Sequence, residues 1–488
     1  MDWYNPQDIE IPNGHFINGE LRTFDDDTLS EVCCPSSGKP YASLPCASEN
    51  TVDFVINSTK QAFTETDWAT MAPRDRADYL FKWASLVEND REYLAQLESL
   101  GSSRPYHEVL QWDIPYVVDC LKFFAELADK HGGYIGATQQ NRLGMVINQP
   151  YGVVGAITPW NFPMSMLIWK VGPALAAGNA VVLKPSELTP FSSNHLARLA
   201  CDAGIPKNIF NVVQGLGHTV GQAICEHPSI GKVTFTGSTA TGAAIMSTCA
   251  LKGPKPSTLE LGGKSPQIVF NDADLDKTAT IVAKAITGNA GQVCVSGSRL
   301  IIHESIEKQF TQQLVEYFSQ LKMGATWDKE TTLPPIISAR QADRIESIVS
   351  QSIADGAELI CGGKKVLEGG TFYTPTILKM NKADNCAITS EIFGPVLTVQ
   401  TFQTDEEAWN LASHETYGLA VGIHTNDIKR ALTGMRKVEA GSVWINRYGR
   451  SFDHIMPTGG FKQSGIGKDI GVEAFQANLH SKSVLIDF

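Results

Sequence analysis

A cysteine set among small residues is the first feature of this sequence that could do chemistry. Cys294 lies in the stretch 288–299, where glycines and small side chains leave a thiol open to a reacting carbon. Upstream, Glu260 precedes a Gly-Gly turn at residues 262–263, one strand–helix excursion before the cysteine. A thiol that attacks and a carboxylate that activates water would together support a two-step acyl-enzyme chemistry. Taken alone, such a cysteine is more often structural, so the rest of the chain must decide.

The elements that would position these groups alternate between strands and helices. Between Tyr151 and Gly263, each β-like run ends near Gly, Pro, Ser or Thr and is followed by a helix-forming segment. The four runs are residues 153–157, 180–183, 209–213 and 232–235. This βαβ pattern predicts an α/β fold with a parallel sheet, whose ligands bind beyond the carboxyl ends of the strands.

Polar and glycine residues follow these runs at the predicted binding edge. Asn161 lies between two prolines after the first run, where a rigidly held amide could stabilise an oxyanion. Lys184 follows the second run, Gly217 the third, and Gly237 the fourth. Glycines that open a helix let backbone N–H groups approach a phosphate, although neither stretch matches Gly-x-Gly-x-x-Gly and each could be an ordinary turn.

The other segments extend this α/β organisation. Helical spacing is expected from Thr51, over 74–100 and over 114–130, and a hairpin is expected around Asn18 and Gly19. A second α/β region runs from 265 to about 440. The terminal segment 481–488 reads as a strand that needs a sheet to join, and 132–150 is its expected partner.

Composition excludes several classes of function. The net charge of −12 disfavours nucleic acids and anionic membranes as partners. The ten cysteines form no Cys-x-x-Cys pair and no zinc pattern, which indicates reduced thiols and no metal site. The first residues lack a basic region followed by an apolar run, so we expect no signal peptide and a cytoplasmic, soluble protein.

All of these segments, in this order and spacing, resemble the aldehyde dehydrogenase superfamily across essentially the whole chain. The most specific matches are the stretches 259–265 and 288–294. The resemblance implies a Rossmann-like NAD-binding domain (1–126 and 151–260), an α/β catalytic domain (261–462) and a β arm for oligomerisation (127–150 and 470–488). It also implies a homodimer or homotetramer.

The resemblance assigns roles to the chemical groups already identified. Cys294 would attack the aldehyde, and the amide of Asn161 with the Cys294 N–H would hold the oxyanion. Oxidation by the nicotinamide would leave a thioester, which water activated by Glu260 would hydrolyse to the carboxylic acid. Many family members relay a proton through a lysine and a second glutamate. Here the lysine is Lys170 but the acid is Asp469, one methylene shorter; this puts a direct relay in doubt, and a water could fill the gap.

The family's NAD contacts also map onto this sequence. Lys184 and Glu187 would hold the adenosine ribose, Trp160 and Ser238 the pyrophosphate, and Glu391 with Phe393 the nicotinamide end. Gly217 and Gly237 complete the predicted cofactor set. A carboxylate at Glu187 accepts hydrogen bonds from ribose hydroxyls and repels a 2′-phosphate, which favours NAD while leaving NADP open.

The substrate pocket is expected to be largely apolar. Its predicted lining comes from the segment after Asn161, the neighbours of the cysteine and the loop 447–458. The residues are Phe162, Met166, Leu167, Trp169, Val293, Val295 and Arg450. Arg447 or Arg450 could recognise an anion on the substrate, or both could make structural contacts.

Three alternative functions deserve comparison. A CoA-acylating dehydrogenase does not need a water-activating carboxylate, so Glu260 argues against it. A cysteine hydrolase would need a histidine base, and no histidine lies in the motifs around Cys294. A non-catalytic family member would be expected to lose Cys294, Glu260 or Asn161, yet all three are present.

Overall fold

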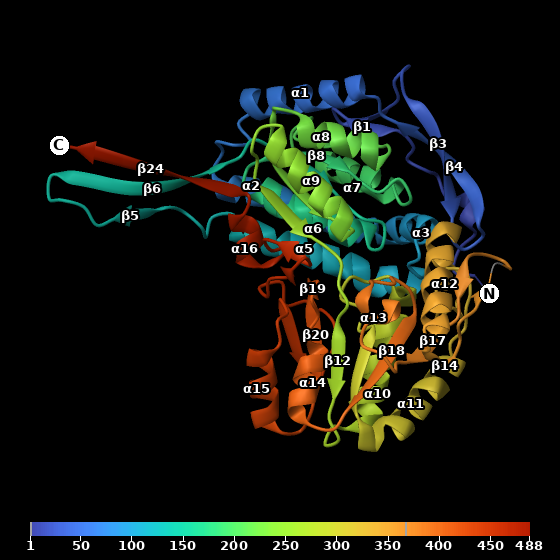
Figure 1. Ribbon diagram of the computed structural model, residues 1–488. Coiled ribbons are helices and arrows are strands. Elements are labelled where there is room, and N and C mark those ends of the chain that lie inside the picture. The colour runs from blue at the N-terminus through green and yellow to red at the C-terminus, as the bar shows by residue number, and fades with distance from the viewer. Residues whose placement is uncertain (1, 367) are drawn as a thin grey trace.

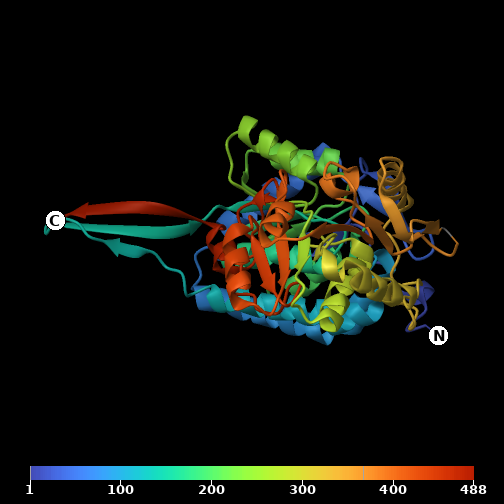
Figure 2. The same cartoon turned by 60° about the horizontal axis from the view of Figure 1, so that its bottom comes forward.

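The computed structural model describes residues 2–366 and 368–488. Two sheets, each flanked by helices, form the body, and a ribbon of strands projects from it (Figure 1). The view turned by 60° shows the same ribbon extending well clear of the body (Figure 2). No helix among the described residues is both long and apolar enough to cross a membrane.

The first sheet contains the predicted parallel strands. Its order is β2-β1-β9-β8-β7-β10-β11-β23, with parallel pairing from β9 to β11 and antiparallel pairing at both edges. The bounds are β1 (His15–Ile17), β2 (Glu20–Arg22), β7 (Val153–Ile157), β8 (Ala180–Lys184), β9 (Phe210–Val212), β10 (Ile230–Thr236), β11 (Ser257–Glu260) and β23 (Gly465–Ile466). All four predicted runs are therefore strands of one sheet, and β1 with β2 forms the predicted hairpin.

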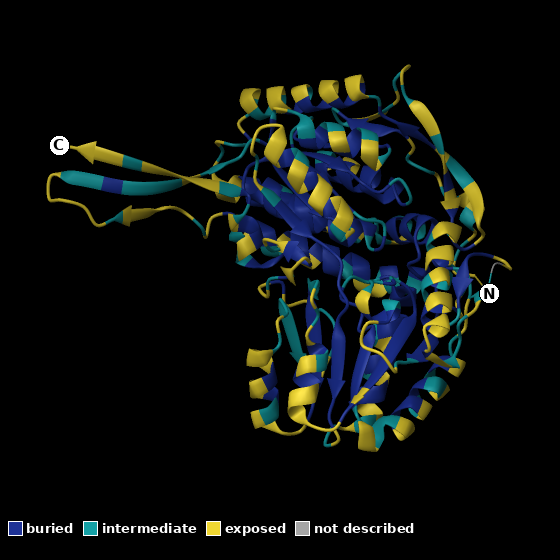
Figure 3. Cartoon of the chain, viewed as in Figure 1, coloured by how far each residue is buried: buried dark blue, intermediate teal, exposed yellow. Residues whose placement is uncertain are grey.

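Helices cover both faces of this sheet, and the side chains of successive strand residues alternate between the two faces. Val154 and Val181 face one core, packed by helices α2, α5, α6 and α7, while Val153 and Val182 face a second core with α1, α8 and α9. The period of two follows from the pleat of a strand that is buried on both faces. Figure 3 shows the sheet dark blue beneath partly exposed helices. The helices are α1 (Glu49–Glu65), α2 (Pro73–Asn89), α5 (Ile114–Leu127), α6 (Pro163–Ala176), α7 (Phe191–Asp202), α8 (Gln222–Glu226) and α9 (Thr239–Leu251).

The second sheet follows the same plan. Its order is β14-β17-β18-β13-β12-β20-β21, parallel except for the edge strand β14. Helices α10 and α11 pack on one face and α14 on the other. The bounds are β12 (Pro266–Val269), β13 (Arg299–His303), β14 (Glu358–Cys361), β17 (Thr376–Lys379), β18 (Val396–Phe402), β20 (Ala420–His424), β21 (Ser442–Ile445), α10 (Leu275–Thr287), α11 (Glu304–Ser319), α12 (Ala339–Ala354), α14 (Asp405–Ala412) and α15 (Ile428–Lys437).

The projecting ribbon pairs the predicted terminal strand with the segment before the first sheet. Strand β24 (Leu479–Asp487) runs antiparallel to β6 (Arg142–Pro150), which also pairs with β5 (Tyr134–Gly136). The short helix α16 (Gly471–Gln476) packs against α5 and α6, so residues 470–478 lie on the body and only the following strand projects. Leu485 and Ile135 are exposed on this ribbon.

Candidate active site

The registers of the first sheet bring the predicted polar groups to one edge. Thr236 pairs with Glu260, Phe235 with Ile157, and Ile157 with Lys184, so strands β7, β8, β10 and β11 end at the same level. The loop that carries Asn161 therefore emerges beside Glu260, as expected for carboxyl ends of parallel strands.

Cys294 lies on a strained loop between α10 and β13, which leads from the second sheet to this edge. Asn289, Ala290 and Gly291 have positive φ values of 50°, 50° and 71°. A Cβ at Gly291 would lie 2.1 Å from the carbonyl oxygen of Gly394, so only glycine fits there. The Gln292 side chain is buried and donates to the carbonyls of Asn289 and Pro335, which fixes the turn just before the cysteine.

Hydrogen bonds tie this loop to the loop of Asn161. Asn161 Nδ2 donates to the Gln292 carbonyl at 3.0 Å, and Asn289 Nδ2 donates to the Asn161 carbonyl at 3.1 Å. One amide proton of Asn161 is thereby used for positioning, and the second is free for an oxyanion. Within the described chain, the Cys294 N–H has no backbone acceptor, so it is the second donor available at this point.

The electrostatics of the thiol and the carboxylate are coupled. Burial raises the pKa of the Cys294 thiol, and the nearby Arg450 guanidinium opposes this rise. Arg450 Nη2 lies 3.6 Å from the Cys294 sulfur. Burial, and then the charge of Asp469, raise the pKa of Glu260 well above its ordinary value. Glu260 Oε1 is buried and has no protein partner among the described residues, so it is available to a water or a reacting group.

Behind Glu260 lies a buried ion pair between the two predicted relay residues. Lys170 Nζ lies 2.5 Å from Asp469 Oδ2, and the side chains are 0% and 3% exposed. The shorter acid therefore contacts the lysine directly, without a gap for a water to fill. Asp469 N–H and C=O pair with Thr458, and this bridge brings the shorter acid directly against Lys170.

A cavity of about 260 Å³ opens on one side of Cys294. It is lined by predicted cofactor residues from both domains: Trp160, Gly237, Ser238, Glu391 and Phe393. The Trp160 and Phe393 rings meet edge to face, with centroids 5.1 Å apart. Ser238 caps the thirteen-residue helix α9, whose N-terminal N–H groups suit an anion such as a pyrophosphate.

The backbone at Gly262 and Gly263 leaves space for the Glu391 carboxylate in this cavity and binds it. The carboxylate accepts a hydrogen bond from the Gly263 N–H at 3.0 Å, and burial raises the pKa of Glu391 to about 6. A Cβ on Gly262 would lie 2.4 Å from Glu391 Oε2, so the glycine leaves room for the carboxylate. Arg344 and Gln341 on α12 donate hydrogen bonds to the carbonyls of residues 391–393 and so hold the Glu391 loop in place. No sequence motif had indicated this role for either residue. These features fit a dinucleotide.

The remaining predicted cofactor residues lie at neighbouring strand ends rather than in the cavity wall. Lys184 Nζ is buried at the end of β8 and lies 3.2 Å from Glu187 Oε2. Burial lowers the pKa of Lys184, and the Glu187 carboxylate opposes this effect. Gly217 begins the helical turn η3 (Gly217–Gly221) after β9.

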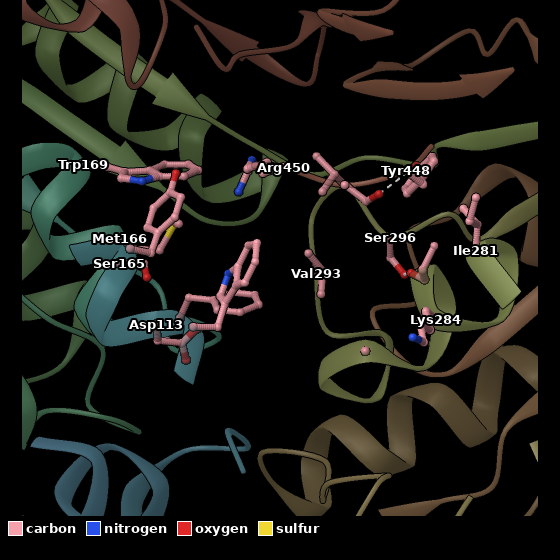
Figure 4. A pocket seen from close by; sticks show the side chains of 17 residues that line it. Asp113, Ser165, Met166, Trp169, Ile281, Lys284, Val293, Ser296, Tyr448 and Arg450 are labelled. Carbon is pink, nitrogen blue, oxygen red and sulfur yellow. Dashed lines mark hydrogen bonds between the residues drawn. The ribbon is translucent and has the colours of Figure 1, made fainter. Parts of the chain in front are cut away.

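A second cavity, of about 340 Å³, adjoins the first and is lined by Val293 and Val295, the two neighbours of Cys294 (Figure 4). All the predicted substrate residues except Leu167 line it: Phe162, Met166, Trp169, Val293, Val295 and Arg450. Leu167 was a wrong prediction, because it lies on the opposite face of α6 and is fully buried in the first core. Phe162, Met166, Val293 and Arg450 line both cavities, and Cys294, which follows Val293, lines the first of them.

The wall of this second cavity also contains residues that the sequence did not single out. Trp112 and Asp113 come from the helical turn η2 (Val109–Asp113) and Tyr116 from α5, while Ile281 and Lys284 come from α10. Tyr448 donates to the Val295 carbonyl at 2.8 Å and so holds the loop of Arg450 against the cysteine loop. Arg447, in contrast, is exposed and donates to the Gly449 carbonyl, outside both cavities.

Comparison with known proteins identifies the family. Residues 23–484 match the model of the Aldehyde dehydrogenase family. The chain belongs to this family. An aldehyde dehydrogenase of Aspergillus niger is 39% identical, with 97% of this chain and 95% of that protein covered. The chain spans about half the length of two other relatives, cytosolic 10-formyltetrahydrofolate dehydrogenases of Xenopus tropicalis and Xenopus laevis, each 36% identical over 99% of this chain and 54% of the relative.

Solved structures confirm the aldehyde dehydrogenase fold. The aldehyde dehydrogenase KauB from Pseudomonas aeruginosa superposes with a TM-score of 0.96 and is 38% identical, with 99% of this chain and 98% of that chain covered. The same values hold for the P. syringae AldA indole-3-acetaldehyde dehydrogenase in complex with NAD+ and IAA. The family and these structures support aldehyde oxidation and NAD as the cofactor.

Proposed function

We propose that this protein oxidises an aldehyde to the carboxylic acid with NAD, through a thioester on Cys294 that water hydrolyses. The observation that carries the proposal is a thiol in the wall of a cavity that suits a dinucleotide, beside a second, largely apolar cavity that its neighbours Val293 and Val295 line. Two oxyanion donors and a buried, unpartnered carboxylate lie around this thiol.

In the first half-reaction, the Cys294 thiolate attacks the aldehyde carbon. Arg450 favours the thiolate, since it opposes the burial that raises the thiol pKa. The free amide proton of Asn161 and the Cys294 N–H then bind the oxyanion. NAD, when bound, accepts the two electrons and the hydrogen that the substrate carbon loses. Glu391 and Phe393 would hold its nicotinamide end, Trp160 and Ser238 its pyrophosphate, and Lys184 and Glu187 its adenosine ribose, with Gly217 and Gly237 completing the set.

In the second half-reaction, Glu260 takes a proton from water, and the resulting hydroxide attacks the thioester carbon. The raised pKa of Glu260 makes it a stronger base than an ordinary carboxylate once it is ionised. Cys294 leaves as the thiolate. Lys170 and Asp469 form the pair through which the proton held by Glu260 would pass away from the site.

Glu187 supports a preference for NAD over NADP. Its side chain is partly exposed, and its pairing with Lys184 leaves a carboxylate at the place where a ribose would lie. A 2′-phosphate would add negative charge beside this carboxylate, whereas free hydroxyls would donate to it.

We further propose the domain roles and assembly that the family implies. Residues 1–126 and 151–260 form the NAD-binding domain, 261–462 the catalytic domain, and the ribbon within 127–150 and 470–488 the oligomerisation arm. The apolar side chains exposed on β5 and β24, among them Ile135 and Leu485, support burial of this arm against a second subunit in a homodimer or homotetramer. We place the enzyme in the cytoplasm, because its ten cysteines are all free.

The test is initial rates of NAD and NADP reduction with aliphatic, aromatic, amino- and carboxy-aldehydes, followed by identification of the product. We expect the free acid, and no turnover by Cys294→Ala. A product formed only when CoA is added would favour the acylating alternative. Folded protein that binds NAD but oxidises no aldehyde would favour a non-catalytic role.

A further inference from the structure

We propose that the substrate of this enzyme carries an anionic group, a carboxylate or sulfonate, close to the aldehyde carbon, and that Arg450 binds that group. This inference rests on the proposed function, because it treats the larger cavity as the substrate site and Cys294 as the nucleophile.

Arg450 is a cation for which the described residues offer no ion-pair partner, and it lies in the wall of a largely apolar cavity. No carboxylate lies within ion-pair distance of it in the described chain, and its only hydrogen bond is the 3.6 Å contact from Nη2 to the Cys294 sulfur. Its guanidinium carbon lies 4.3 Å from the centre of the Trp169 ring. The ring holds the plane of the guanidinium, and its remaining N–H groups form a fork that suits a carboxylate. Figure 4 shows Arg450 beside Trp169 at the cavity.

The other charged residues of the cavity wall do not neutralise this cation. The Asp113 carboxylate accepts two hydrogen bonds from Arg104, at 2.7 and 3.0 Å, and both side chains are almost fully buried. Glu260, nearby, has a pKa raised well above its ordinary value by burial and by Asp469. Lys284, across the cavity, is exposed to solvent and adds a screened positive charge at the edge, for which the described residues offer no ion-pair partner. The cavity is therefore positive, and an anionic substrate would be drawn into it.

A third observation concerns a hydrogen-bond donor in the same wall. The Tyr116 hydroxyl is buried and has no acceptor among the described residues. A buried donor without an acceptor is costly, and an anionic oxygen from a ligand would satisfy it. Arg450 lies close enough to Tyr116 to lower its pKa against the effect of burial, which raises it.

The position of Arg450 also limits the distance between the anionic group of the substrate and its aldehyde carbon. A substrate carbon bonded to the Cys294 sulfur lies within a few ångströms of Nη2, so the anionic group must be on a carbon near the aldehyde. A short aldehyde acid fits this arrangement. A cationic aldehyde is disfavoured, because its ammonium group would lie beside the Arg450 guanidinium.

Alkylation of Cys294 by two near-isosteric reagents tests the anion site without turnover. Iodoacetate carries a carboxylate on the reacting carbon, and iodoacetamide carries a neutral amide in its place. We expect Arg450→Gln to lower the iodoacetate-to-iodoacetamide ratio of rate constants at Cys294 by about tenfold, the effect of losing one charged hydrogen bond. Arg450→Lys should keep most of the preference, and Arg447→Gln, the matched control, should leave the ratio unchanged.

Two further measurements complete the test. One compares turnover of a charged and an uncharged substrate, and the other compares how well ligands protect Cys294 from alkylation. Arg450→Gln should lower kcat/KM for 4-oxobutanoate relative to its methyl ester by a similar factor. Independently of any variant, succinate should protect Cys294 of the wild-type enzyme from iodoacetamide more strongly than its uncharged diamide, succinamide, does. Equal ratios in Arg450→Gln, Arg447→Gln and wild type would overturn the anion site while leaving aldehyde oxidation intact. Absence of NAD reduction with every aldehyde would instead overturn the proposed function, and the alkylation ratio would still report on Arg450.

Discussion

Asp469 and Lys170 form the ion pair behind Glu260. Neutralising Asp469 and neutralising Lys170 should shift the pH dependence of thioester hydrolysis in opposite directions. The charge of Asp469 adds to the burial that raises the Glu260 pKa, whereas Lys170 lowers it. Hydrolysis requires ionised Glu260, so its rate increases as the pH rises through the Glu260 pKa. Asp469→Asn should therefore shift this increase to lower pH, and Lys170→Met should shift it to higher pH.

The size of these shifts follows from burial. With Lys170 and Asp469 in direct contact and nearly inaccessible, the loss of one full charge should move the profile by about one pH unit, or about 1.4 kcal/mol. Each variant also leaves a buried charge without its partner, which costs about 3–5 kcal/mol of folding free energy. Both variants should thus lose similar stability while their pH profiles diverge.

The assay uses 4-nitrophenyl acetate, which can acylate Cys294 without oxidation. The burst of 4-nitrophenolate would count acylated sites, and the later steady rate would report hydrolysis of the acyl-enzyme across the pH range. Lys82→Met, a change of an exposed lysine on α2, is the matched control and should not move the profile. Shifts in the same direction, or none, would refute the electrostatic link between the ion pair and Glu260.

Three further predictions address the loop, the oxyanion site and the cofactor. Asn161→Ala should lower kcat by about 10²–10³ because one oxyanion donor is lost, while Cys294 alkylation stays near the wild-type rate; a loss below tenfold in steady-state kinetics would contradict this role. Gly291→Ala should cost at least about 1–2 kcal/mol in urea unfolding, since its Cβ meets the Gly394 carbonyl in a left-handed conformation; unchanged stability would show that the loop can relax. Glu187→Gln should raise the NADP-to-NAD ratio of kcat/KM about tenfold by removing a negative charge beside the ribose, and an unchanged ratio would remove Glu187 from cofactor selection.

Much of the catalytic side of this site was predictable because it depends on local signals. Four apolar runs separated by helical segments predict parallel strands, and parallel strands of matched register end together. Asn161, which follows β7, and Glu260, which ends β11, are therefore brought to one edge by the sheet itself. Cys294 was recognisable because its glycine-rich surroundings differ from those of an ordinary core thiol.

The substrate side was less predictable because distant packing builds it. Trp112 and Tyr116 reach the cavity only because α5 packs against α6, and no local pattern signals that contact. On α6, Met166 and Trp169 are three residues apart and share the cavity face, whereas Leu167 is rotated toward the core. The sequence offered Arg447 and Arg450 as equals, and only the loop conformation separates them.

Asp469 shows how tertiary structure can compensate for side-chain length. The sequence left a direct relay between Asp469 and Lys170 in doubt, because the acid is one methylene shorter than the family's glutamate. The pairing of Asp469 with Thr458 moves the backbone close enough for a direct contact. Side-chain reach can be judged from sequence only when the backbone path is known.

Intact-mass measurement of the enzyme during turnover is the most direct test of the central claim that a thioester on Cys294 is hydrolysed by Glu260-activated water. Glu260→Gln, mixed with aldehyde and NAD, should form about one NADH per site and accumulate one acyl group on Cys294. Cys294→Ala should form neither. Sustained NADH production by Glu260→Gln at the wild-type rate, or NADH formation without an acyl adduct on Cys294, would contradict the account.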